Sequence, residues 1–188
     1  MLRTMKATGI VRRIDELGRV VIPKEIRRTQ RIRQGDALEI FTAPDGEVIF
    51  KKYSPLLELN ELADVYAEVL AKSLGVPVLV CDREAVVAAA GSPKAAKEGM
   101  LGRPITRELE KLLASRSVYT APADPGRRVQ AVSGAGGQVL GCAAPIVVSG
   151  DIEGGVCLLS PDRADPPDDA ETGAVRIAAS FLARWMEE

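Results

Sequence analysis

The chain has 188 residues, of which 46% are hydrophobic and 27% charged, proportions that fit a globular protein of one or two domains. It contains no histidine, which excludes Ser-His-Asp and Cys-His catalysis and removes the commonest metal ligand. The opening MLRTMKATGI lacks the apolar run of a signal peptide, and no stretch approaches the roughly 20 apolar residues of a membrane span. We therefore expect a cytoplasmic protein without a metal site.

The near-neutral net charge of −1 hides an asymmetry along the chain. Residues 1–53 hold 12 of the 25 basic residues and 7 of the 26 acidic ones, a net charge of +5. The remaining residues hold 13 basic and 19 acidic side chains, a net charge of −6. A basic head on an acidic body indicates two domains, of which the head meets a polyanion.

The head, residues 1–53, shows the pattern of short strands around one short helix. Pro23 has a fixed φ and no N–H, so it ends a strand and suits the first turn of a helix. Pro44-Asp45-Gly46 predicts the turn of a hairpin. The expected elements are strands at 7–15 and 18–23, a helix at 24–31, and hairpin strands at 37–43 and 47–52.

The body, residues 56–188, shows helical spacing at both ends and strand-like runs between them. Gly75 closes the first helix, and Asp82-Arg83-Glu84 reads as a hairpin turn rather than a carboxylate pair. GAGG at 134–137 is read as a turn. The expected helices are 56–74, 106–115 and 170–188, and the expected strands are 76–82, 85–91, 128–133, 140–148 and 154–160.

These elements predict an α+β protein whose body is an antiparallel sheet flanked by helices. About fifty residues of short strands bury too little apolar surface to be stable alone, so we expect two chains to share the strands of the head. The outer helices of the body, the last presenting Val175, Ala178, Leu182 and Trp185, could pack only on their own sheet or also pair with helices of a partner subunit.

The three cysteines, Cys81, Cys142 and Cys157, lie far apart, each within an apolar run and without a CxxC pair. This pattern favours buried core thiols. Disulfide and zinc interpretations are the minor alternatives.

TGIVRRIDELGRVVIPKEIRRT, with GDALEIF and EVIFKKYSP after it, resembles the DNA-binding domain of the AbrB family of bacterial transition-state regulators. VCDRE, API near residue 145 and FLARWMEE extend the resemblance to the sporulation regulators of that family. The resemblance implies a swapped-hairpin, barrel-like dimer head, a GAF-type body that senses a signal or assembles tetramers, and activation and repression of genes in the forespore.

The arginines of the head are the candidate functional residues. Several cations on one face favour DNA, because phosphate neutralisation releases counterions, and the arginine fork can also grip a guanine edge. The resemblance assigns DNA contacts to Arg12, Arg19, Arg27 and Arg28, and charge alone adds Lys6 and Arg13. No aromatic residue is interleaved with them, which favours duplex DNA over single strands.

We therefore expect a homo-oligomeric transcriptional regulator that is not an enzyme, has no cofactor and binds double-stranded DNA. An antitoxin is one alternative, although such proteins usually continue as a short toxin-binding tail. A cysteine-dependent reductase of the GAF type is the other. Arg103, Thr120 and Ser133 could line a cavity for an unidentified small-molecule ligand, but nothing distinguishes them from ordinary polar positions.

Overall fold

The computed structural model describes residues 8–54, 56, 60–134, 138–160 and 166–187. The chain forms two compact units, the head at residues 1–53 and the body at residues 54–188.

The head contains α1 (Lys24–Thr29), β1 (Leu38–Thr42) and β2 (Val48–Lys52). The two strands pair antiparallel, and Gly46, with φ of 87°, closes the turn between them, so the expected hairpin is confirmed. The helix follows Pro23 directly, as expected. It ends two residues earlier than expected, because Arg31 adopts φ of 54° and leaves the helical region.

Residues 8–23 form no strand within the single chain, so the two strands expected there are wrong for an isolated head. A strand exists only with a hydrogen-bonded neighbour, and this segment finds none among the described residues of its own chain. Its apolar side chains lie open to solvent: Val11 is 84% exposed and Leu17 is 74% exposed.

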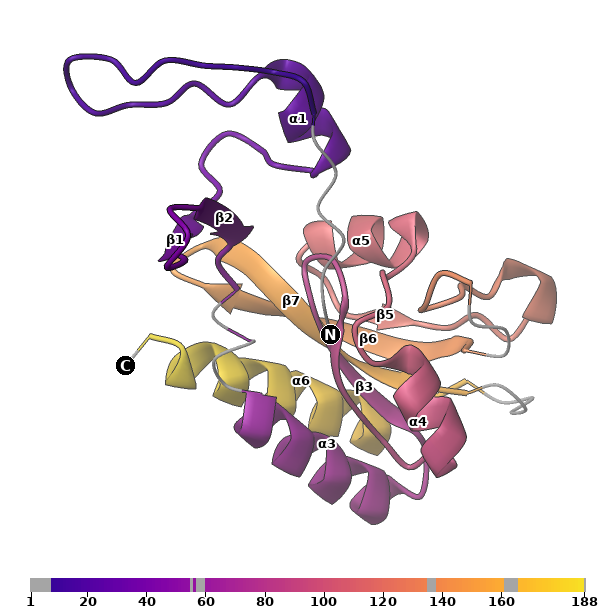
Figure 1. The fold of residues 1–188 in the computed structure, drawn as a ribbon. Coiled ribbons are helices and arrows are strands. Elements are labelled where there is room, and N and C mark those ends of the chain that lie inside the picture. The colour runs from indigo at the N-terminus through magenta and orange to yellow at the C-terminus, as the bar shows by residue number, and fades with distance from the viewer. Residues whose placement is uncertain (1–7, 55, 57–59, 135–137, 161–165, 188) are drawn as a thin grey trace. The chain divides into compact units, whose positions relative to one another are not determined.

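The body is built on a five-stranded antiparallel sheet (Figure 1). The strand order is β4-β3-β7-β6-β5, so the last long hairpin, β6–β7, is inserted beside β3. The strands are β3 (Val78–Asp82), β4 (Val86–Ala90), β5 (Tyr119–Thr120), β6 (Leu140–Val148) and β7 (Asp151–Leu159).

Helices cover both faces of this sheet (Figure 1). On one face, α3 (Asn60–Leu74) and α6 (Asp169–Trp185) pack on Val80, Ile146 and Val156. On the other face, α4 (Lys94–Met100) and α5 (Arg107–Ala114) pack on residues such as Leu79 and Cys157. The expected helix-flanked antiparallel sheet is confirmed. No described helix is long and apolar enough to cross a membrane.

The helix ends follow local chemistry. The Thr106 side chain accepts a hydrogen bond from the Leu109 N–H at 3.1 Å and begins α5. Asp168 and Glu171 form a reciprocal capping box at the start of α6. Gly75, with φ of 69°, ends α3 as expected.

The described body differs from the expected one in two respects. Residues 128–133 form no strand, because this segment makes only isolated bridges, at Gln130 and Val132. The short elements α4 and β5 were not expected. Leu56 and residues 60–74 of the first expected helix are helical, whereas residues 57–59 lie outside the described residues. Most of the GAGG segment, residues 135–137, also lies outside them.

Candidate nucleic-acid interface

The segment DELGR folds into a turn built around Asp15. The backbone closes it twice: Gly18 N–H donates to the Asp15 carbonyl at 3.0 Å, and Asp15 N–H donates to the Arg19 carbonyl at 3.1 Å. Asp15 Oδ1 accepts the N–H groups of Leu17 and Arg19, at 3.0 and 2.8 Å. Gly18 takes φ of 76°, a conformation that favours glycine.

The same carboxylate holds the Arg19 side chain. Arg19 Nε donates to Asp15 Oδ2 at 2.8 Å, while 71% of the Arg19 side chain stays exposed. The backbone N–H of Arg19, followed by its guanidinium, lowers the pKa of Asp15 below its ordinary value of 3.8. Asp15 is therefore ionised at neutral pH and orients Arg19 at the end of the turn.

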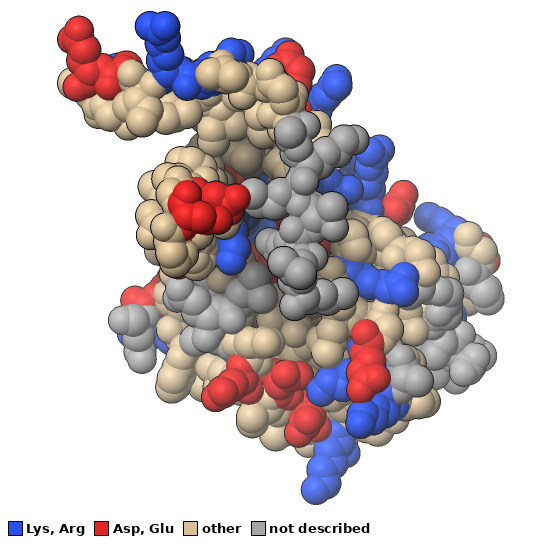
Figure 2. Space-filling view, viewed as in Figure 1, with Lys and Arg blue, Asp and Glu red and all other residues tan. Residues whose placement is uncertain are grey.

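The other candidate arginines lie on either side of this turn. Arg12 and Arg13 precede it, and Arg27 and Arg28 lie on α1; all are exposed. Figure 2 shows basic side chains projecting from the head together with acidic ones. Asp15, Glu16 and Glu25 are exposed acidic residues of the head. Lys6 lies outside the described residues.

Large apolar side chains of the head are also exposed. Residues 8–23 contribute most of them, and the hairpin contributes the rest. So many large exposed apolar side chains on a small unit indicate an interaction site rather than a solvated face. These side chains are Ile10, Val11, Ile14, Leu17, Val20, Val21, Ile40, Val48 and Phe50.

The outer helices of the body have two apolar faces. One face packs on the sheet through residues such as Leu70 and Leu182. The other is exposed on both α3 and α6 and carries Val65, Val69, Ile177, Phe181 and Trp185. Tyr66, Phe181 and Trp185 stack in a row, with ring centroids 4.8 and 5.9 Å apart. Trp185, which the sequence groups with Val175, Ala178 and Leu182, is 48% exposed and belongs to this outer face.

The three cysteines are free and buried, so the prediction of core thiols is confirmed. Burial raises the pKa of the Cys142 thiol to about 12. Contact with Cys81, together with burial, raises the pKa of Cys157. Thiols of raised pKa are poor nucleophiles, because the thiolate is the reactive form.

Two of the three residues considered for a ligand cavity donate to backbone carbonyls. Ser133 Oγ donates to the Ile105 carbonyl at 3.1 Å, and Arg103 Nη1 donates to the Gly134 carbonyl at 3.2 Å. Thr120 lies exposed on β5. Among the described residues no three potential ligands gather to hold a metal ion.

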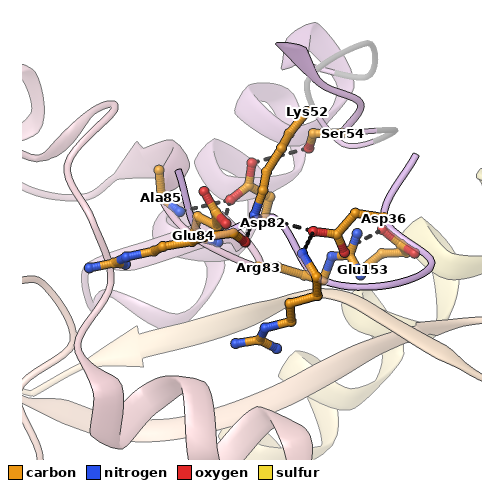
Figure 3. Close-up of polar contacts among 10 residues, drawn as sticks. Asp36, Lys52, Ser54, Asp82, Arg83, Glu84, Ala85 and Glu153 are labelled. Carbon is orange, nitrogen blue, oxygen red and sulfur yellow. Dashed lines mark hydrogen bonds and ion pairs between the residues drawn. The ribbon is translucent and has the colours of Figure 1, made fainter. Parts of the chain in front are cut away.

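Asp82 has a role that the sequence did not indicate (Figure 3). Its Oδ1 accepts the N–H groups of Glu84 and Ala85, each at 2.7 Å, which confirms the expected turn. Its Oδ2 accepts the hydroxyl of Ser54 at 3.1 Å, from the first residue of the body. A sequence separation of 28 residues hides this interaction from any local pattern.

Comparison with known proteins agrees with both units. A GAF domain/HD domain protein from Geobacter sulfurreducens matches the fold over 68% of this chain and 91% of that chain, with a TM-score of 0.51 and 21% identity. The transition state regulatory protein AbrB of Bacillus subtilis is 54% identical over 61 residues, which span 32% of this chain and 62% of that protein. These likenesses define the class: an AbrB-like head joined to a body of the GAF fold.

Two family models match the chain. The model for the stage V sporulation protein T C-terminal domain, a transcription factor, covers residues 58–187, and the model for the antitoxin MazE covers residues 11–56. Stage V sporulation protein T of Bacillus subtilis is 49% identical over 185 residues, 98% of this chain and all of that protein. The chain therefore belongs to the stage V sporulation protein T family of transcription factors.

Proposed function

We propose that this protein is a cytoplasmic, sequence-selective regulator that binds duplex DNA through its head and both activates and represses sporulation genes in the forespore. The two units serve as separate domains, residues 1–53 for DNA and residues 56–188 for assembly or sensing. The DNA-contacting side chains are Lys6, Arg12, Arg13, Arg19, Arg27 and Arg28.

The observation that carries this proposal is the exposed Arg19 held at the end of the DELGR turn by Asp15. An arginine fixed in orientation loses less side-chain entropy when it meets a phosphate or a base edge. The exposed arginines on either side of the turn add charge for phosphate neutralisation, which accounts for much of DNA affinity.

The exposed apolar side chains of residues 8–23 support a dimer of heads. A second copy would supply the missing strand neighbours and cover Val11, Leu17 and Val21, which are 71–84% exposed in the single chain. The arginines would then be doubled on one surface. The exposed apolar face of α3 and α6 supports a second interface between dimers, which gives a tetramer through the body.

The alternatives are less well supported. The antitoxin model ends at residue 56, and a folded body follows where an antitoxin usually has a short tail. The reductase requires a reactive thiolate, whereas Cys142 and Cys157 have raised pKa values in buried positions. A small-molecule signal for the body is retained, without a named ligand.

The test is a fluorescence-anisotropy titration of the full chain on a promoter duplex and a scrambled duplex over a series of salt concentrations. We expect a steep fall of log K with log salt, and preference for the promoter. Equal affinity for the two duplexes would contradict sequence selectivity. No binding at low salt would contradict the function altogether.

A further inference from the structure

Two successive glycines in β7, Gly154 and Gly155, lie between the two apolar cores of the body. Successive residues of a strand face opposite sides of a sheet. Leu56, at the start of the body, lies over Gly154 on the face covered by α3 and α6. Leu113 of α5 lies over Gly155 on the opposite face.

Both leucines approach the strand so closely that a Cβ at either glycine would force neighbouring atoms to shift. A Cβ at Gly154 would lie 2.7 Å from Leu56 Cδ1 and 2.0 Å from the Cys81 carbonyl oxygen. A Cβ at Gly155 would lie 2.5 Å from Leu113 Cδ2. At this point only the backbone of the sheet separates α5 from Leu56.

The neighbouring strand β3 pairs with both glycines. Asp82 pairs with Gly154 and Cys81 pairs with Gly155 in the β3–β7 register. Asp82 also accepts a hydrogen bond from the Ser54 hydroxyl, and Leu56 packs on Gly154. Ser54 and Leu56 therefore both contact the Asp82–Gly154 pair. Ser54 and Leu56 are the residues at which the chain leaves the body toward the head.

We propose that the Gly154–Gly155 step couples the packing of α5 to the attachment of Ser54 and Leu56. Close-packed interiors transmit small displacements, because no free volume absorbs them. A shift of Leu113 against Gly155 moves the β7 backbone, and with it the surface on which Leu56 rests. Any change on the α5 face thus alters how firmly the chain is held where it leaves the body.

Hydrogen exchange on the DNA-free full chain tests this coupling at the amides of Ser54 and Leu56. Leu113→Ala is compared with Leu109→Ala, because both leucines are buried on α5. Two of the three atoms nearest the Cβ position at Gly155 belong to Leu113, and none belongs to Leu109. We expect Leu113→Ala to speed exchange at Leu56 at least about twofold more than Leu109→Ala does, the lower limit for coupled residues. Equal effects of the two variants would overturn the proposal.

Rescue separates coupling from general loss of stability. Gly155→Ala places a methyl group in the space that Leu113→Ala vacates, so exchange at Leu56 in the double variant should return toward the parent rate. The milder Leu113→Val, with Leu109→Val beside it, gives the same comparison if the alanine variants do not fold. Failure of rescue in a folded double variant would overturn the proposal.

The consequence for DNA rests on the proposed function and is measured separately. On a promoter duplex, Leu113→Ala should change affinity more than Leu109→Ala does. Equal affinities, in protein that binds DNA, would overturn the link from α5 to the head. Absence of DNA binding in the parent protein would instead contradict the proposed function, and the exchange measurement would still decide the coupling.

Discussion

Arg19 meets the carboxylate of Asp15 twice, through its backbone N–H at 2.8 Å from Oδ1 and through Nε at 2.8 Å from Oδ2. One acidic residue therefore sets both the shape of the turn and the direction of the arginine. The pKa of Asp15 is lower in the folded turn than in the unfolded chain. The stability that the ionised carboxylate gives the turn is therefore present above about pH 4 and is lost as pH falls through the lowered pKa.

Asp15→Ala removes the carboxylate that accepts the Leu17 and Arg19 hydrogen bonds. We therefore expect weaker DNA binding, although a negative charge is also removed. Asp15→Asn retains an acceptor for the Leu17 and Arg19 N–H groups and should bind nearer to the parent. Anisotropy titrations at constant salt compare the two. Equal or tighter binding by Asp15→Ala would mean that charge, and not the geometry of the turn, controls the affinity.

Arg19→Ala and Arg28→Ala should each abolish measurable operator binding while leaving the oligomer intact. Removing one arginine costs about 1–3 kcal/mol of binding free energy in each subunit, and the substitution is present in both subunits of a dimer. The slope of log K against log salt also becomes shallower by roughly 0.9 for every phosphate that is no longer neutralised. Arg107→Ala, at an exposed position on α5, is the matched control. Parental affinity in either head variant would refute its assignment.

Ile177→Glu should reduce a tetramer to a dimer without unfolding the body, because Ile177 is 67% exposed in the single chain. Light scattering after gel filtration measures the mass, and circular dichroism checks the fold. Ala114→Glu adds the same charge at an exposed position on the other side of the sheet. A mass unchanged by Ile177→Glu would rule out the α3–α6 face as the interface between dimers.

The two glycines of β7 should differ in how they tolerate alanine. Leu113→Ala alone should cost about 2–5 kcal/mol, and Gly155→Ala alone about 1–3 kcal/mol. Their combination should cost less than the sum, because the added methyl group fills the vacated space.

Gly154→Ala is the contrasting case. Leu56→Ala should not rescue it, since the Cys81 carbonyl oxygen still lies 2.0 Å from the new Cβ position. Urea denaturation of all six variants measures these costs. Comparable rescue at both glycines would contradict the packing described for β7.

The cysteines should resist alkylation in the native protein and react after denaturation, as counted by mass spectrometry with iodoacetamide. The raised pKa of Cys142 also stabilises the fold below about pH 9, and that contribution, at most about 4 kcal/mol, is lost as pH rises toward 12. Cys142→Ala should therefore show a flatter fall of stability above pH 9. Rapid native alkylation would reopen the reductase interpretation.

The sequence by itself determined the features that depend on neighbours in the chain. Pro23 placed the start of α1, Pro44-Asp45-Gly46 placed the hairpin, and Gly75 placed the end of α3, because each acts through the φ of its own residue. The head arginines could be singled out because they cluster within one stretch. Their contacts with DNA stay a prediction.

Only the tertiary structure decided the features that join distant segments. The Ser54–Asp82 hydrogen bond and the packing of Leu56 and Leu113 on adjacent glycines depend on strand register, which no local pattern specifies. Residues 128–133 look like a strand in sequence and make only bridges, because pairing depends on the neighbours that the fold supplies. Residues 8–23 show the same dependence, since apolar alternation alone provides no partner for their backbone hydrogen bonds.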